Sequence, residues 1–230
     1  MAVTLTQITT RAKQLADMVN SSFISSTEWT DYINAGYMEL YDLVVAAFED
    51  YFTTTTTSTI TTGNTFSLPA DFYKLRGLDY SLNGEYVNCT QFNFGDRNLT
   101  STWRSTALYN RAGRQYRIIG STVYIIPDDR AAGTYQLWYV PAVTPLSSGS
   151  DTIDSSLTKF GWEEYIALYA AERAQNKQEN DVTVLQNQRA QLASRITSMA
   201  ANRNVDQPEK ITDIQSELYN TMLTRDYDGA

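Results

Sequence analysis

The chain has 230 residues, of which 42% are hydrophobic and 19% charged, and this balance is typical of a folded globular protein. Lysine and arginine number 18 against 26 acidic residues, so the formal net charge is -8 and a basic nucleic-acid-binding surface is not expected. The chain contains no histidine and one cysteine, Cys89. These counts exclude an internal disulfide framework, Ser-His-Asp triads and Cys-His dyads, and they leave only carboxylate, lysine or tyrosine chemistry.

Targeting and ligand-binding motifs are missing from the sequence. Residues 1–20 lack the apolar core of a signal peptide, and no apolar run approaches the ~20 residues that cross a bilayer. We therefore expect synthesis and folding in a cytoplasm and no membrane partner. A Walker A loop and a G-x-G-x-x-G fingerprint are also missing, so we predict no cofactor and no metal site.

Two amphipathic helices are predicted near the N-terminus. The first covers Leu5 to Val19, and the second begins after Ser25-Ser26-Thr27-Glu28, which has the spacing of a capping box. Apolar residues then recur at helical spacing from Trp29 to Phe48. Gly36 interrupts this second helix at a cost of about 1 kcal/mol relative to alanine. It marks either a bend, which we favour, or the close approach of a neighbouring backbone.

Short β-strands are predicted between residues 53 and 141. The threonine-rich stretch from Thr53 to Ile60 favours an edge strand. Asn83-Gly84 predicts a hairpin between strands 75–82 and 85–89, and Gly120-Ser121 predicts a type II′ hairpin between strands 116–119 and 122–126. A further strand covers residues 135–140, and residues 99–113 form an excursion without clear period. Contiguous strands indicate a meander that forms an antiparallel sheet or a small sandwich.

The last third of the chain, from Trp162 to about Met222, is predicted to be long helix with a narrow apolar stripe. The residues of the stripe are Val182, Leu185, Arg189, Leu192, Ile196 and Met199. Arg189 occupies the one position of the stripe where an apolar residue is missing. Such a stripe packs against another helix or another copy of the chain. Pro208 separates it from a second short stripe of Ile211, Ile214 and Leu218. We predict an assembly surface on both stripes.

The predicted fold class is α+β. Residues 1–52 and 142–205 form a helical bundle from both chain ends, and residues 53–141 form an inserted antiparallel β-sheet or sandwich. Residues 206–230 form a docking tail that continues the extended C-terminal helical arm.

Two clusters of polar residues are candidates for chemistry. Asp128-Asp129 follows Pro127, and such a pair either acts as acid and base on a glycosidic bond or forms a turn, which is the favoured interpretation. The second cluster is basic and surrounds Tyr109 and Tyr116; it comprises Arg104, Arg111, Arg114 and Arg117. It contacts an acidic partner or a phosphate backbone, or it is a solvated loop or subunit contact. We favour the last pair of alternatives because the chain as a whole is acidic.

One segment carries a family resemblance. Residues 63–78, Gly-Asn-Thr-Phe-Ser-Leu-Pro-Ala-Asp-Phe-Tyr-Lys-Leu-Arg-Gly-Leu, follow a helix that contains Ile-Asn-Ala-Gly-Tyr-Met-Glu-Leu-Tyr at residues 33–41. This order resembles the head-to-tail adaptor proteins of short-tailed phages, the family that includes tail tubular protein A. Residues 172–181 and the stripe after them are similar to that family's C-terminal helices. The resemblance covers roughly residues 25 to 205.

The resemblance implies a structural virion protein without catalytic residues. Proteins of this family form a dodecameric ring below the portal vertex, reach the portal with their C-terminal segments, receive the tail nozzle on the lower face and pass the genome through the lumen. The expected partners are therefore the portal protein, the tail nozzle protein, other copies of the chain, and genomic DNA without sequence-specific contact. The expected location is the neck of the virion, after assembly in the host cytoplasm.

Two other functions stay open on the sequence alone. One is a different neck or tail component whose aromatic β insertion binds a glycan or receptor, which would require an exposed aromatic patch. The other is a glycan hydrolase, which would require two carboxylates in one cleft about 5–10 Å apart.

Overall fold

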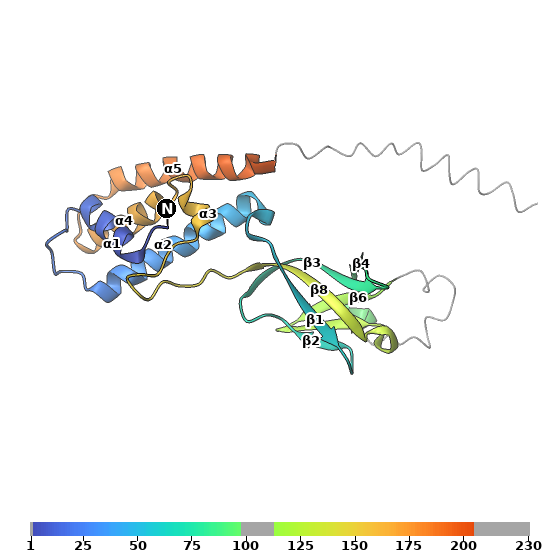
Figure 1. Ribbon diagram of the computed structural model, residues 1–230. Helices are drawn as coiled ribbons and strands as arrows, with labels where there is room; N and C mark the ends of the chain where they lie inside the picture. Colours follow the sequence, from blue (N-terminus) through green and yellow to red (C-terminus); the bar gives the residue numbers. More distant parts are fainter. Residues whose placement is uncertain (1, 98–112, 205–230) are drawn as a thin grey trace, which may run out of the picture.

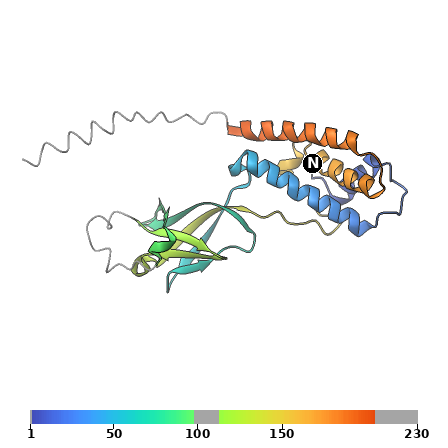
Figure 2. The same ribbon diagram turned by 180° about the vertical axis from the view of Figure 1, so that it is seen from behind.

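The computed structural model describes residues 2–97 and 113–204. These residues form an elongated molecule with a helical bundle at one end and a β-sandwich at the other, and the two views in Figures 1 and 2 show this separation. The helices are α1 (Leu5–Leu15), α2 (Ser26–Ala47), α3 (Ser155–Thr158), α4 (Glu163–Lys177) and α5 (Thr183–Ala201). The strands are β1 (Thr54–Ile60), β2 (Thr65–Ser67), β3 (Phe72–Leu82), β4 (Glu85–Asn88), β5 (Thr90–Gln91), β6 (Gln115–Ile119), β7 (Thr122–Ile126) and β8 (Gly133–Pro141).

The predicted α+β fold class is confirmed. Helices come from both ends of the chain, and all eight named strands lie between residues 54 and 141. Among the described residues, no helix is both long and apolar enough to cross a bilayer. The predicted tail at 206–230 and most of the excursion at 99–113 lie outside the described residues.

The bundle core lies between α1, α2, α4 and α5: α2 and α4 pack against each other, and α1 and α5 each pack against both of them. Trp29, Ile33 and Leu40 of α2 and Trp162 and Tyr165 around α4 are almost completely buried there. Ser25 caps α2 by accepting a hydrogen bond of 3.2 Å from the backbone N–H of Glu28. The Glu28 carboxylate does not complete a capping box, because it accepts hydrogen bonds from Lys177 and Tyr32.

The surroundings of Gly36 differ from the expectation that α2 bends at this residue. The helix runs unbroken through Gly36, and this residue is buried at the contact with α4. A Cβ atom added at Gly36 would lie 3.1 Å from Cβ of Tyr169. The glycine therefore permits close packing of two helices, and the favoured interpretation as a bend was wrong. The approaching group is a side chain, whereas the alternative named a backbone.

The prediction of one long helix after Trp162 was also wrong. The chain breaks between Gln178 and Val182, where Glu179 adopts a positive φ of 59°, and α4 and α5 pack side by side. Asp181 then accepts a hydrogen bond of 2.9 Å from the backbone N–H of Thr183 at the start of α5. The Thr183 hydroxyl also donates to Asp181, and this bond, followed by the backbone bond, holds the pKa of Asp181 below its ordinary value. The break turns the predicted arm into a helical hairpin.

The β region is a sandwich of two four-stranded sheets, with strand orders β1-β8-β3-β4 and β2-β7-β6-β5. Both predicted hairpins are present: Asn83 and Gly84 have positive φ between β3 and β4, and Gly120 has φ of +60° between β6 and β7. β1 is an edge strand, as predicted. The predicted meander was wrong, because β8 inserts between β1 and β3 and because β5 and β6 pair in parallel.

The core of the sandwich is rich in tyrosine. Tyr80, Tyr116, Tyr135 and Tyr139 are buried between the sheets together with Leu78, Val123, Ile125 and Leu137. Tyr135 donates a hydrogen bond of 2.7 Å to the carbonyl of Ala131, so its hydroxyl is satisfied inside the core. These four tyrosines are therefore used in packing, whereas Tyr73, Tyr86, Phe94 and Trp138 are exposed.

Candidate assembly interface

The stripe on α5 packs against helices of its own chain. Ile196 is completely buried, and Leu185 and Leu192 are half-buried against the bundle core formed with α2 and α4. Val182 is half-buried at the N-cap, and Met199 is exposed at the far end. The sequence left two partners open for this stripe, another helix or another copy, and the structure places it on other helices. Its role as a portal or subunit interface stays a prediction, restricted to exposed side chains such as Met199.

Arg189, which occupies the position of the stripe without an apolar residue, forms an ion-pair network. Its guanidinium donates to Glu172 at 2.8 Å and to Glu39 at 2.7 Å, and it lies over the rings of Tyr165 and Tyr169. Tyr165 donates a hydrogen bond of 2.6 Å to the same Glu39 carboxylate. Burial, followed by this hydrogen bond to Glu39, raises the pKa of Tyr165 to about 12. The polar residue in the stripe thus fixes α5 against both α2 and α4.

The basic cluster divides at the boundary of the described residues. Arg104 and Arg111 lie outside them, as does Tyr109. Arg114 lies over the ring of Tyr80 at 4.6 Å and donates to the carbonyl of Ala132 at 2.9 Å. Arg117 donates to the carbonyl of Phe92 at 3.1 Å. Both described arginines are therefore engaged within the sandwich, and contact with an acidic partner stays a prediction for the cluster as a whole.

The candidate acidic pair lies in a tight turn. Asp128 and Asp129 begin the short 3-10 helix η4 (Asp128–Arg130), and Asp128 accepts a hydrogen bond of 2.7 Å from the side chain of Asn64. This contact ties the turn to the segment before β2. Within residues 2–97 and 113–204, no three His, Cys, Asp or Glu side chains are grouped so that they could hold a metal ion.

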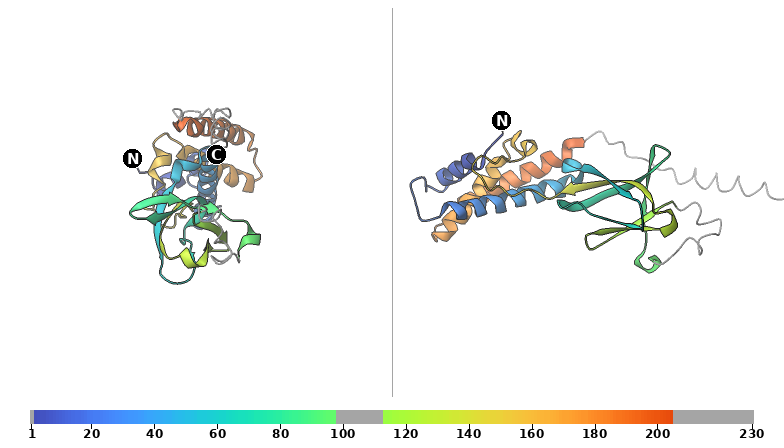
Figure 3. Two further views of the ribbon diagram at one scale, coloured as in Figure 1. Left: turned by 90° about the vertical axis from the view of Figure 1, so that its right-hand side faces the viewer. Right: turned by 60° about the horizontal axis from the view of Figure 1, so that its bottom comes forward.

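An ion-pair cluster that was not predicted from the sequence joins the bundle to the sandwich. Glu49 and Asp50 lie in η1 (Glu49–Phe52) just after α2, and they pair with Lys74 and Arg76 of β3. Beside this cluster, Tyr41 donates a hydrogen bond of 2.6 Å to the carbonyl of Pro141, where β8 leaves the sandwich. The sequence signal for this cluster was a pair of adjacent acidic residues followed, 25 positions later, by two basic residues at alternate positions. These contacts set the direction in which the sandwich projects from the bundle (Figure 3).

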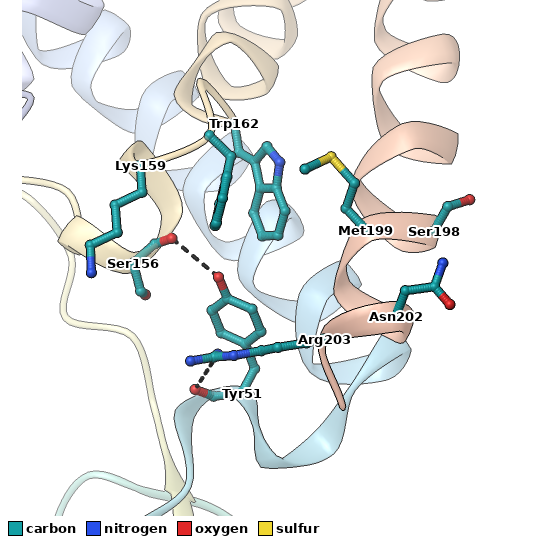
Figure 4. Close-up of a pocket in the computed structure, with 9 residues that line it drawn as sticks. Tyr51, Ser156, Lys159, Trp162, Ser198, Met199, Asn202 and Arg203 are labelled. Carbon is teal, nitrogen blue, oxygen red and sulfur yellow. Dashed lines mark hydrogen bonds between the residues drawn. The ribbon is translucent and has the colours of Figure 1, made fainter. Parts of the chain in front are cut away.

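A pocket opens at the end of the bundle where α5 finishes. It has a volume of about 490 Å³, and its wall combines aromatic, aliphatic and basic side chains from η1, from the segment around α3, from Trp162 before α4 and from the C-terminal end of α5. The lining residues, drawn in Figure 4, include Tyr51, Lys159, Phe160, Trp162, Met199 and Arg203. Phe160 is 49% exposed and Met199 40% exposed. Exposed apolar side chains around a hollow are typical of a surface that binds another segment of protein.

The Arg203 side chain closes one side of this pocket. Its guanidinium lies 4.0 Å from the ring centre of Tyr51 and donates to the Tyr51 carbonyl at 3.4 Å. The Tyr51 hydroxyl donates in turn to the carbonyl of Ser156 at 3.2 Å, and Figure 4 shows both hydrogen bonds. On the opposite wall the indole N–H of Trp162 is buried and has no acceptor among the described residues. As far as the described residues extend, the pocket therefore has a buried donor without a partner and a cationic rim.

The comparison with protein-family models identifies the chain. The model for the SU10 adaptor protein matches residues 3–212, which includes the whole bundle and the whole sandwich. A comparison with curated proteins gives no match. Because the matched span covers nearly the entire sequence, the chain belongs to the SU10 adaptor protein family, a family of bacteriophage adaptor proteins.

Proposed function

We propose that this protein is a head-to-tail adaptor that forms a ring between the portal and the tail nozzle and lines the DNA channel. Membership of a phage adaptor family carries the proposal, since it implies a structural virion component associated with other proteins of the neck or capsid. The ring, its position in the neck and the identity of its two partners are the parts that the proposal adds.

The two-part shape of the subunit supports a ring. A ring needs two different surfaces on each subunit that fit one another around a closed circle. The ion pairs between Glu49 and Lys74 and between Asp50 and Arg76 hold the sandwich at a defined angle to the bundle. Each subunit can then present a helical surface and a β surface to different neighbours. A contact of about 1,600 Å² at each junction would hold the ring without covalent links.

The acidic charge of the chain supports passage of DNA. With a formal net charge of -8, a lumen lined by this protein repels phosphate, whereas a basic wall would retain the genome by counterion release. We therefore expect a negative lumen in the assembled ring. Mapping the electrostatic potential on an experimentally determined ring tests this point, and a strongly positive lumen would refute it.

Docking on the portal is assigned to the C-terminal segment that starts after Asn204. This segment carries the stripe of Ile211, Ile214 and Leu218. A chain that ends at Asn204 retains every described helix and strand and should bind purified portal at least tenfold more weakly than the full chain. A change of Ser216 to Ala in the full chain serves as the control. Full portal binding by the truncated chain would exclude this docking role.

One observation favours a second candidate, a neck or tail component that binds a glycan or receptor through the sandwich. Trp138 is 39% exposed, and its indole N–H donates a hydrogen bond of 2.7 Å to Asp79 of the neighbouring strand. Tyr86 is also exposed on the adjoining strand β4. Glycan-array binding that is lost on changing Trp138 to Ala would support this alternative.

A further inference from the structure

The pocket at the end of the bundle has an incomplete set of contacts. Phe160 and Met199 expose apolar surface at its mouth, and Trp162 has a buried N–H that finds no acceptor in the described part of the chain. Figure 4 shows the indole nitrogen on the side of Trp162 that faces Met199. Lys159 and Arg203 add positive charge to the rim. A complementary occupant would bring aliphatic side chains, a carbonyl or carboxylate acceptor, and negative charge.

The sequence that follows the described residues has this chemistry. Residues 205–230 contain six acidic and two basic side chains, a net charge of -4, and they include the aliphatic stripe of Ile211, Ile214 and Leu218. The acidic residues Asp213 and Glu217 immediately precede Ile214 and Leu218 of the stripe in the sequence. The segment is therefore apolar along one line and negatively charged overall, which complements an apolar pocket with a cationic rim.

The position of the pocket also favours the chain's own segment. Asn202 and Arg203 line the pocket and are among the last described residues, so the segment starts at the rim. Six residues, Val205 to Lys210, separate the described chain from Ile211, and they can span up to ~20 Å when extended. A tether this short gives an effective concentration in the millimolar range, which another molecule does not reach in dilute solution.

We propose that the C-terminal segment of the free subunit folds back and covers this pocket with Ile211, Ile214 and Leu218. The proposal concerns the protein before assembly and does not require a ring. One consequence rests on the proposed function. If the same segment docks on the portal, the portal must first displace it from the pocket, so in the free chain the docking segment is bound to the pocket.

Disulfide trapping in the full-length chain tests the proposal. The variant combines Met199→Cys with Ile214→Cys in a Cys89→Ala background. The protein concentration is kept below about 1 μM, because dilution suppresses encounters between chains. We expect an intrachain disulfide that forms at least tenfold faster than in two control pairs. One control combines Met199→Cys with Ser216→Cys, on the opposite side of the stripe if the segment is helical. The other combines Gln188→Cys, an exposed residue near the middle of α5, with Ile214→Cys.

The outcomes separate the alternatives. A disulfide between two chains would overturn the proposal and assign the pocket to a second copy. Equal rates in the test pair and both control pairs would overturn it as well. As a second measurement that needs no cysteine, hydrogen exchange of the full chain should speed up at residues 199–203 in Ile214→Asp and stay unchanged in Ser216→Asp. Unfolding midpoints confirm that each variant is folded. All these measurements use the free chain, so a failure to bind portal does not affect them.

Discussion

Gly36 and Tyr169 hold the two central helices of the bundle at close range: a Cβ at Gly36 would lie 3.1 Å from Cβ of Tyr169. The contact joins α2 to α4, two helices separated by the whole β-sandwich in sequence. Because the Tyr169 Cβ is fixed to the backbone of α4, it can yield only if the two helices move apart. The bundle thus depends on a residue that is unfavourable within its own helix.

The substitution Gly36→Ala therefore sets two effects against one another. Helix propensity gains about 1 kcal/mol, whereas overpacking at a buried helix contact costs about 1–3 kcal/mol. We expect a net loss of about 1 kcal/mol in the free energy of unfolding, measured by urea titration. Gly77→Ala is the matched control, because a Cβ at Gly77 meets no atom of the described residues within 4 Å. A higher urea midpoint for Gly36→Ala than for the wild type would show that the contact is not restrictive.

Removal of Arg189 should destabilise α5 in particular. The change Arg189→Ala leaves the carboxylates of Glu172 and Glu39 without their shared cation, and the Glu172 side chain is only 14% exposed. We expect a loss of about 1–3 kcal/mol, less than for a fully buried pair because Glu39 remains open to water. Arg195→Ala, at an exposed site on the same helix, should change stability by less than about 0.5 kcal/mol. Equal effects of the two variants would mean that the network contributes nothing.

The buried thiol of Cys89 predicts a loss of stability in alkali. Burial raises the pKa of the Cys89 thiol from its ordinary value of 9.0 to about 12. Above pH 9 the unfolded chain loses this proton while the folded chain keeps it. The free energy of unfolding should therefore fall by up to about 1.4 kcal/mol per pH unit from this group between pH 9 and 12.

The variant Cys89→Ala isolates this contribution. It creates a small cavity whose cost does not depend on pH, and it removes the ionisation. Between pH 8 and 10.5, urea titrations should show a shallower fall of stability with pH for Cys89→Ala than for the wild type. Parallel curves would contradict the raised pKa of the thiol.

Charge reversal at the junction should alter the angle between the bundle and the sandwich more than it alters stability. The pairs of Glu49 and Asp50 with Lys74 and Arg76 are partly exposed, so each contributes about 0–1 kcal/mol. The double change Glu49→Lys and Asp50→Lys should broaden the distance distribution from small-angle X-ray scattering. Adding Lys74→Glu and Arg76→Glu should restore it. A distribution that is identical in all three proteins would show that the tyrosine and backbone contacts fix the angle alone.

Local signals in the sequence predicted the elements better than their arrangement. Asn83-Gly84 and Gly120-Ser121 specified two hairpins because a turn is determined by the residues within it. No local signal indicated that β8 lies between β1 and β3, since those pairings join residues 54–60 and 72–80 to 133–141. The same limit applies to Gly36, whose partner Tyr169 is more than 130 residues away.

In the candidate interface too, local sequence signals predicted the element but not its partner. The spacing of Leu185, Leu192 and Ile196 correctly indicated a buried stripe, but helical spacing does not distinguish a helix of the same chain from one of another chain. The break at Glu179 decided the partner, and it involves a residue with no intrinsic turn signal. The pocket at Phe160 and Trp162 was missed because it exists only where four separate segments meet.

The mass of the protein in solution, alone and mixed with the purified portal, tests the central claim most directly. The account predicts a ring between portal and tail nozzle, so the mixture should give a complex of one portal with many copies of this chain, while the chain alone should have a mass near 26.0 kDa. A chain that stays at this mass in the presence of every candidate portal and tail protein would contradict the account.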